Sequence, residues 1–303
     1  MTDTETVAPL EEPSLGDFHG HRTRLLRGPH VWLEVLADAG PRIVRLGVAG
    51  SARNLLAETP DEGWDTPHGR YQLFGGHRLW FAPEDPARVA VPDTNGLELT
   101  VSARTLGLTG LAESPTGLIR SMTIELDPDT PAFVLRHEIR NIGEGAVELA
   151  PWSITQLPLG GTVLLPQAVA VTGHHVRPNR MLVLWPYTSW EDDRFVPRDG
   201  LLTLSATAGP GLKLGYYNDA GWVGYAHDGS LLVRRFTPVP GATHPDLGCN
   251  VETYVGPRFL ELELLGPLEQ VPPGGTATLL ERWEIHAAEV ADPRVLADRL
   301  RTR

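Results

Sequence analysis

The stretch Phe133–Leu157, FVLRHEIRNIGEGAVELAPWSITQL, contains the pattern that decides the fold class. In its first eight residues, Phe133, Leu135 and Ile139 share one face of an extended chain, because side chains alternate between the two faces of a strand. The segment Asn141–Gly145, NIGEG, has the glycine content of a short loop, and a second strand-like run follows it. The stretch therefore predicts two strands joined as a long antiparallel hairpin.

Strand-like runs broken by Gly, Pro, Asn and Asp recur along the rest of the chain, whereas helical periodicity is almost absent. The other runs are Val31–Leu36, Ile43–Val48, Leu97–Ala103, Leu118–Leu126, Ala168–Thr172, Met181–Tyr187, Leu201–Ala206, Leu212–Tyr217, Trp222–Ala226, Leu231–Thr237, Val251–Val255, Phe259–Leu265 and Thr276–His286. At the end of the chain, Asp292 and Pro293 supply an N-cap and a first-turn proline. The pattern predicts an all-β sandwich with a short C-terminal helix.

The chain has no linker rich enough in Gly, Ser or Pro to divide its 303 residues. Large all-β sandwiches often exceed 200 residues as one unit. Residues 1–15 are acidic and contain proline, which favours a poorly ordered tail. We therefore expect this tail to be followed by a single β domain over residues 16–303.

The composition excludes several classes of partner. A formal net charge of −12 argues against nucleic acid and against anionic membrane surfaces. The first residues lack the basic and apolar regions of a secretory signal, and no apolar run is long enough to span a bilayer. We therefore expect a cytoplasmic protein, a monomer or homodimer, whose partner is a small molecule.

Sequence motifs for metal or cofactor chemistry are missing. The single cysteine, Cys249, excludes an intramolecular disulfide and any zinc site with several cysteines. The chain has no HExxH, no P-loop, no GxSxG and no strand–GxGxxG–helix unit. We expect neither a metal nor a cofactor.

The segment Phe74–Pro86, FGGHRLWFAPEDP, gathers residue types that suit a sugar. Gly75 and Gly76 permit close backbone approach, Arg78 offers a fork of donors, and Trp80 offers an apolar plane. Glu84 adds an acceptor. The alternative is a glycine turn followed by a core tryptophan and a surface charge pair.

Lys213 is the only lysine of the chain, among 26 basic residues. A lysine kept among so many arginines is a candidate for a role that a compact ammonium fills better, although chance survival explains it equally well. It lies mid-strand, where a buried ammonium needs a carboxylate partner. We expect it to share a concavity with Glu252 and one of Glu261 or Glu263. The alternative for these glutamates is a solvated strand face.

Two further features bear on a site. The loop Leu184–Phe195 places Tyr187 and two tryptophans beside carboxylates, which suits either carbohydrate binding or an aromatic plug over the core. His174 and His175 are adjacent, so in a strand they would point to opposite faces, which disfavours shared metal ligation.

Taken together, the motifs resemble the galactose mutarotase-like superfamily, which includes the aldose 1-epimerases, over about residues 32–286. The closest resemblance is to an uncharacterised bacterial branch. The matching motifs, in chain order, are GG-x-R-x-W-x-x-PE at Gly75–Glu84, PW-x-x-T at Pro151–Thr155, Gly160-Gly161, Pro166-Gln167, K-x-G at Lys213–Gly215, Gly221-Trp222, E-x-Y at Glu252–Tyr254, LELE-x-LGP at Leu260–Pro267 and PPGG at Pro272–Gly275.

The resemblance implies a large antiparallel β-supersandwich whose concave sheet binds a sugar. It implies that Arg78 holds the sugar and that a glutamate of the LELE-x-LGP strand, Glu263 first and Glu261 second, is the base at the anomeric hydroxyl. The family's acid histidine is replaced by Trp152-Ser153. The remaining candidate acids are His77, His175 and Lys213. The candidate substrate-binding residues are Arg78, Trp80, Glu84, Trp152, Tyr187, Lys213, Trp222 and Glu252.

Three functions follow as hypotheses. The first is a carbohydrate-binding enzyme of aldose 1-epimerase type, an isomerase that acts at the anomeric centre by acid–base chemistry. The second is a non-catalytic sugar-binding or sensor protein on the same scaffold, because a fold alone does not decide function. A polysaccharide lyase or hydrolase is the third.

Overall fold

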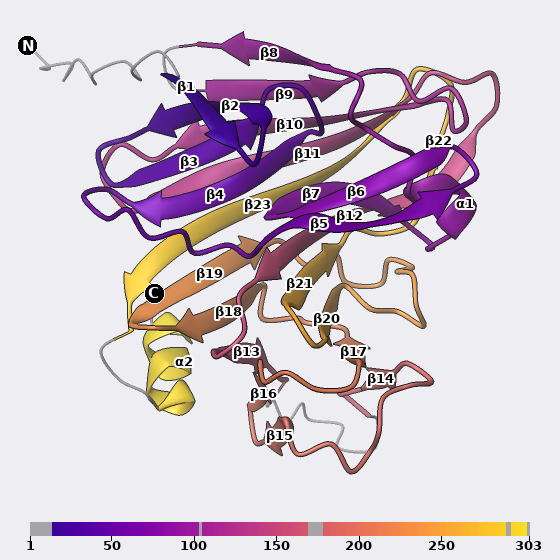
Figure 1. Ribbon diagram of the computed structural model, residues 1–303. Coiled ribbons are helices and arrows are strands. Elements are labelled where there is room, and N and C mark those ends of the chain that lie inside the picture. Colours follow the sequence, from indigo (N-terminus) through magenta and orange to yellow (C-terminus); the bar gives the residue numbers. More distant parts are fainter. Residues whose placement is uncertain (1–13, 103–104, 169–177, 289–291, 302–303) are drawn as a thin grey trace, which may run out of the picture.

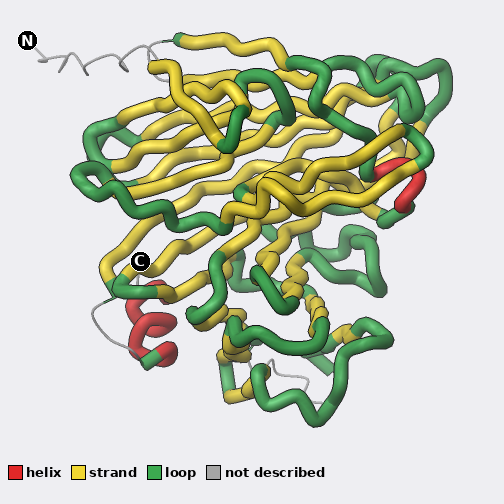
Figure 2. The backbone as a smooth tube through the Cα atoms, in the orientation of Figure 1, coloured by secondary structure: helices red, strands yellow, loops and turns green. Residues whose placement is uncertain are grey.

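The computed structural model describes residues 14–102, 105–168, 178–288 and 292–301. Strands dominate this part of the chain, and they form two large antiparallel sheets packed face to face (Figure 1, Figure 2). The sheet of eleven strands is called sheet 1, and the sheet of ten strands is called sheet 2. The predicted all-β sandwich fold is confirmed.

Sheet 1 carries the residues that matter most for the site. Its spatial order is β1 (Ser14–Phe18), β2 (His21–Arg27), β3 (Val31–Leu36), β4 (Arg42–Val48), β7 (His77–Ala82), β12 (Val147–Leu157), β21 (Leu260–Leu265), β20 (Val251–Val255), β17 (Leu212–Tyr216) and β14 (Val183–Leu184), with β22 (Glu269–Val271) paired to β12.

Sheet 2 closes the other side of the sandwich. Its order is β15 (Phe195–Arg198), β16 (Leu201–Ser205), β13 (Thr162–Pro166), β18 (Trp222–His227), β19 (Ser230–Phe236), β23 (Thr276–Ala287), β11 (Ala132–Asn141), β10 (Leu118–Leu126), β9 (Thr105–Gly110) and β8 (Leu97–Val101). A separate hairpin, β5 (Glu58–Thr66) and β6 (Gly69–Gly75), lies in front of β7 and β12 (Figure 1).

Alternating apolar side chains build the core between the sheets. Leu212 and Leu214 of β17 and Leu262 of β21 pack there against residues of sheet 2 such as Phe133 and Trp283. Because neighbours along a strand point to opposite faces, the polar residues between these leucines lie on the outer face of sheet 1. Burial of the leucines in the core thereby places the polar residues of these strands on the outer face of sheet 1.

The predicted hairpin between β11 and β12 is wrong. The loop after Asn141 carries the chain from sheet 2 to sheet 1, where β12 pairs with β7, β21 and β22. Residues 149–157 of β12 are all buried, which is the pattern of a central strand enclosed on both faces. A short loop therefore joins strands of opposite sheets here.

Most predicted strands are present with bounds within a residue or two, but three regions differ. Only Val183–Leu184 of the run Met181–Tyr187 is a strand, and the run Ala168–Thr172 lies, beyond Ala168, outside the described residues. Strand β1 begins at Ser14, before the end of the tail predicted for residues 1–15, of which residues 1–13 lie outside the description.

The two helices found among the described residues both begin at a capping aspartate. The predicted C-terminal helix is α2 (Pro293–Arg301), and the backbone N–H of Arg294 donates to Asp292 Oδ1 at 2.9 Å, as an N-cap requires. The four-residue α1 (Pro86–Val89) was not predicted; Asp85 is its N-cap and accepts from the N–H of Ala87.

Each sheet takes strands from both halves of the chain, so we propose that residues 16–303 form one domain. No helix in the part of the chain that the structure describes is long and apolar enough to cross a membrane.

The turn from β6 into β7 explains the two glycines of the first motif. Gly75 and Gly76 have φ angles of 92° and 65°, in the left-handed region. A Cβ at Gly76 would overlap the carbonyl oxygen of Ile43, and one at Gly75 would overlap that of Ala57. The glycines therefore let the hairpin lie directly against β4 while the chain enters β7.

Replacing Gly76 with alanine is expected to destabilise the fold by about 1–3 kcal/mol from backbone strain, with the clash added to it. The matched control is Gly241→Ala, because Gly241 has a φ of 79° but nothing within 4 Å of its missing Cβ. Urea unfolding of both variants measures the difference. Equal losses for the two would show that close packing at Gly76 is unimportant.

Candidate functional site

The register of sheet 1 brings distant parts of the chain into one row on its outer face. Arg78 of β7 lies opposite Ile154 of β12, Ile154 opposite Glu263 of β21, and Glu263 opposite Glu252 of β20. Residues directly opposite each other across adjacent strands point to the same face. Arginine and the two glutamates therefore emerge on the same side.

Neighbouring rows complete the set. Gln156 lies opposite Glu261, Glu261 opposite Tyr254, and Tyr254 opposite Lys213. A third row pairs Trp80 with Trp152. The polar and aromatic side chains thus come from five adjacent strands, β7, β12, β21, β20 and β17, that are far apart in sequence.

A cavity of about 390 Å³ opens on this face, within the size range of small-molecule sites. The β5–β6 hairpin forms one wall through Trp64 and Leu73, and the loop after β14 contributes Trp185 and Tyr187. The full lining is Trp64, Leu73, Arg78, Trp80, Glu84, Trp152, Ile154, Trp185, Tyr187, Lys213, Tyr254, Phe259 and Glu261. We call this cavity the sheet 1 pocket.

Lys213 is held by two carboxylates, as predicted. Its Nζ lies 2.8 Å from Glu252 Oε2 and 3.1 Å from Glu263 Oε2, and Trp152 Nε1 donates to Glu263 Oε2 at 2.8 Å. An ammonium has three N–H donors, so one remains for a ligand in the pocket that Lys213 lines.

Aromatic rings and a missing Cβ fix the position of the ammonium. Nζ lies 4.9 Å from the ring centre of Trp152 and 4.7 Å from that of Trp185, within cation–π range. At Gly215, a Cβ would come within 3.0 Å of Glu252 Cγ and 2.8 Å of Cys249 Sγ. Gly215 therefore leaves the room that Glu252 needs beside Lys213.

The three charges shift one another's pKa. Burial raises the pKa of Glu252 to about 9, against the lowering effect of Lys213. Burial also raises the pKa of Glu263, with the charge of Glu261 adding to it. Burial tends to lower the pKa of Lys213, but the two carboxylates outweigh it, so the pKa is raised. The lysine is therefore charged at neutral pH.

Arg78 and Glu261 form the second charged pair of the pocket. Arg78 Nη2 donates to Glu261 Oε1 at 2.9 Å, and Gln156 Nε2 donates to the same oxygen at 3.1 Å. The Arg78 guanidinium lies 4.6 Å from the ring centre of Trp80. The side chain of Glu261 is 15% exposed and that of Glu263 only 1%, so Glu261 is the glutamate of β21 that a ligand can reach.

Tryptophans form the floor and one wall of the pocket. The rings of Trp80 and Trp152 meet edge to face with centres 5.6 Å apart, and Trp64 meets Trp80 at 6.3 Å. Trp80 Nε1 donates to the hydroxyl of Tyr71 at 2.8 Å, which fixes the indole. Burial raises the pKa of Tyr187, at the rim, to about 12, so its hydroxyl stays protonated.

The structure brings most of the predicted site residues together. Those that line the sheet 1 pocket are Arg78, Trp80, Glu84, Trp152, Tyr187, Lys213 and Glu261. Glu252 and Glu263 are buried beside them through Lys213. Their roles in binding and catalysis stay predictions.

Two predicted residues lie elsewhere. Trp222 belongs to sheet 2, where it packs in a cluster with Leu296 of α2. His77 points from β7 into the sandwich, where Nδ1 contacts Thr155 Oγ1 and Nε2 contacts His137 Nε2, both at 2.8 Å. Alternation along β7 places it opposite to Arg78. His175 lies outside the described residues.

His77 belongs to a buried polar cluster with His137 and Glu281, whose potential metal-ligating atoms lie within 4.8 Å of one another. Glu281 is ion-paired with Arg234 at 2.9 Å, and the two histidines contact each other. The protein itself thus provides partners for these groups.

Sequence reasoning missed Trp64, Leu73, Phe259 and Gln156. The only signal for Trp64 was the hairpin turn in DTPHGRY, which predicts two paired strands but not their position over β7. Gln156 could have been found from its place on the PW-x-x-T strand next to Thr155.

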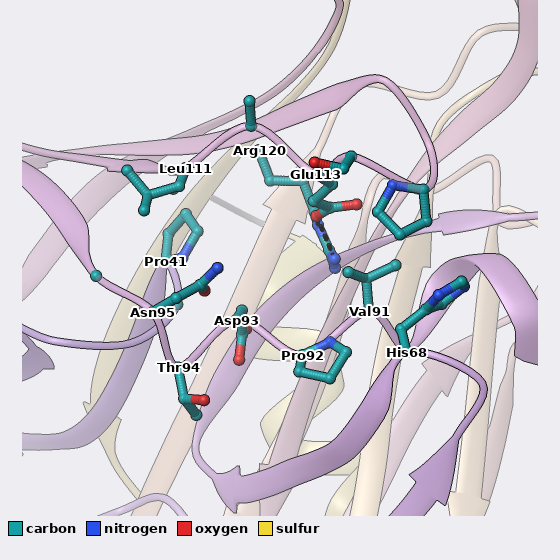
Figure 3. Close-up of a pocket in the computed structure, with 16 residues that line it drawn as sticks. Pro41, His68, Val91, Pro92, Asp93, Thr94, Asn95, Leu111, Glu113 and Arg120 are labelled. Atoms are coloured by element: carbon teal, nitrogen blue, oxygen red, sulfur yellow. Dashed lines mark hydrogen bonds and ion pairs between the residues drawn. The ribbon is translucent and has the colours of Figure 1, made fainter.

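A second cavity, of about 340 Å³, lies beside the loop 91–96 (Figure 3). Its charged groups are already paired: Arg120 with Glu113, and Asp93 with Arg42 at 3.0 Å. Because these contacts join separate segments of the chain, they have a clear structural role.

No protein-family model matches the chain, and no curated protein matches it in sequence. Several solved structures are similar to the chain in fold. A TPR-domain containing protein from Parabacteroides distasonis matches 90% of the chain with a TM-score of 0.60 and 15% identity, and the chain spans 48% of that protein.

Two further structures match over nearly their whole length. A candidate mutarotase, YeaD, from Salmonella typhimurium has a TM-score of 0.58 and 13% identity, covering 92% of this chain and 97% of its own. A galactose mutarotase-like protein from Lactobacillus casei has a TM-score of 0.54 and 10% identity, covering 87% and 100%. The chain has the galactose mutarotase-like fold that the motifs predicted.

Proposed function

We propose that the sheet 1 pocket binds a monosaccharide, or the terminal sugar of a larger carbohydrate, and that the protein interconverts its anomers by acid–base chemistry. The observation that carries the proposal is the pocket lining, in which indole rings alternate with paired charged groups. An indole plane suits the C–H face of a sugar, and Arg78, Glu261 and Lys213 suit its hydroxyls. The mutarotase-like proteins of the same fold support this choice.

Glu261 is the preferred base in this proposal, because its carboxylate reaches the pocket while Glu263 is buried. Lys213 faces the same space two strands away, at a Cα separation of about 10 Å from the strand spacing. A pyranose between them would place its anomeric hydroxyl near Glu261 and its ring oxygen near Lys213. General acid and base groups typically contribute 10²–10⁴-fold each.

Exchange NMR of a mixture of α and β anomers tests this function. The wild type is expected to accelerate exchange for at least one aldose of a panel, and Glu261→Gln to reduce the acceleration by about 10²-fold. Glu125→Gln, on the far sheet, is the control and should match the wild type. Wild-type protein that binds no sugar in calorimetry would overturn the proposal.

A non-catalytic sugar-binding protein is the second candidate. Two observations favour it: no histidine among the described residues lines the pocket, and Glu261 is held by both Arg78 and Gln156. Its signature would be a calorimetric dissociation constant for a sugar with no acceleration of anomer exchange.

A further inference from the structure

The cross-strand pair Glu252–Glu263 carries more negative charge than its surroundings balance. Both side chains are at most 1% exposed. Among the described residues, the cation ion-paired to them is Lys213, so two carboxyl groups share one ammonium. Directly opposed residues have Cβ atoms about 5 Å apart, which forces the two carboxyl groups together.

Oxygen atoms without partners point to the same imbalance. Glu252 Oε1 and Glu263 Oε1 are buried and have no hydrogen-bond partner in the described part of the chain. An ionised carboxylate in such a place is strongly disfavoured, and two like charges at this separation cannot both ionise easily. A proton on the pair removes the excess charge.

Within the described part of the chain, the other groups around the pair do not supply a second, unpaired cation. Asp246 and Glu261 add negative charge nearby, Cys249 is a buried thiol, and Trp152 donates one N–H to Glu263. Burial raises the pKa of the Cys249 thiol, so it stays neutral. Two arginines lie near the pair, and each has its own carboxylate: Arg78 is paired with Glu261, and Arg234, whose charge acts on Glu263 from sheet 2, is paired with Glu281 at 2.9 Å.

We propose that Glu252 and Glu263 hold one exchangeable proton beside Lys213, and that this proton passes through Lys213 to the ring oxygen of the sugar. The relay rests on the proposed function, whereas the bound proton does not. Glu252 and Glu263 are then positioning residues that act through Lys213, and together they take the place of a pocket histidine, which the described residues do not supply.

The proton steps balance without another reactant. Glu261 removes the proton from the anomeric hydroxyl, the C1–O bond to the ring oxygen breaks as the carbonyl forms, and a Lys213 N–H bond breaks as the ring oxygen gains that hydrogen. The amine of Lys213 then takes the proton of the carboxyl pair. Ring closure on the other face reverses each transfer.

The carboxyl pair makes the lysine a usable acid. An ammonium whose pKa is raised is a poor proton donor by itself. When the carboxyl pair reprotonates the amine of Lys213, the net proton donor is a carboxylic acid. The pKa of Glu252, raised to about 9, lies closer to neutral pH than the raised pKa of the ammonium. The pair titrates as a unit, so either glutamate can carry the proton.

Infrared spectroscopy of the intact protein tests the bound proton directly. At pH 7 we expect a protonated carboxyl C=O band that disappears as the pH rises past about 9. Glu252→Gln and Glu263→Gln should each remove it. Glu281→Gln should leave it, because Glu281 is equally buried but its pKa is lowered by Arg234. A wild-type spectrum without the band would overturn the proposal, whatever the variants do.

Anomer exchange tests the relay. Glu252→Gln, which mimics the protonated side chain but holds no exchangeable acid, is expected to lower kcat by about 10²-fold, leave KM unchanged and abolish the alkaline limb of the pH profile. Unchanged kcat in this variant would overturn the relay. A band in the wild type without any anomer exchange would overturn the enzymatic function and leave the bound proton established.

Discussion

Replacing Lys213 with methionine is expected to destabilise the folded protein by about 3–5 kcal/mol at pH 7, measured by urea unfolding. The substitution keeps an unbranched apolar stem but leaves Glu252 and Glu263 buried without their cation. The loss should shrink as the pH falls towards 5, because protonation then neutralises both carboxyl groups. It should shrink similarly in the double variant with Glu263→Gln, which removes one of the two carboxyl groups that the ammonium holds.

An exposed ion pair supplies the control for this prediction. Arg22 lies 3.9 Å from Asp38 and its side chain is 76% exposed, so Arg22→Met should change stability by at most about 1 kcal/mol. If Lys213→Met also stays within about 1 kcal/mol at pH 7, the ammonium does not balance the buried glutamates. If a Lys213→Arg variant kept the full stability and the full sugar binding of the wild type, a compact ammonium would not be required between Trp152 and Trp185.

The local part of the fold was predictable because it depends on neighbours in sequence. Alternation in β11 assigns the correct residues to each face, and Asp292 and Pro293 mark the start of α2. Which strand pairs with which was not predictable. The short loop after Asn141 satisfies a hairpin and a crossing between sheets equally well, and only the burial of β12 on both faces decides between them.

In the candidate site, too, the features that depend on local chemistry were predictable and those that depend on strand pairing were not. Lys213 was placed correctly because a buried ammonium requires a carboxylate, whatever the topology. Trp222 was expected in the pocket but packs under α2 on sheet 2. Trp64, for which no role was predicted, is brought to the pocket by a hairpin that packs across β7. His77 was separated from Arg78 by simple alternation, which the sequence already contained.

Acidification between pH 6.5 and 5 is expected to destabilise the protein through its buried histidines. Burial lowers the pKa of His77 well below its usual value, with the charges of His137 and Arg234 adding to this, and burial lowers that of His137 as well. Above pH 6.5 both states hold neutral imidazoles. Below it the unfolded chain binds protons that the folded protein cannot, so stability falls by up to about 1.4 kcal/mol per pH unit for each histidine.

Between pH 6.5 and 5 the Glu252–Glu263 pair stabilises the folded protein as the pH falls, whereas the histidines destabilise it. Variants are therefore needed to separate the two effects. The folded protein holds a proton on Glu252–Glu263 that the unfolded chain releases above pH 5, and this contribution grows as the pH falls. His77→Asn, which retains a polar partner for Thr155, should therefore lose up to about 2 kcal/mol less than the wild type between pH 6.5 and 5, whereas Glu252→Gln should lose up to about 2 kcal/mol more. Each variant removes one titrating group. If the curves of unfolding free energy against pH were parallel for the wild type and both variants, neither the histidine cluster nor the carboxyl pair would titrate differently in the folded and unfolded protein.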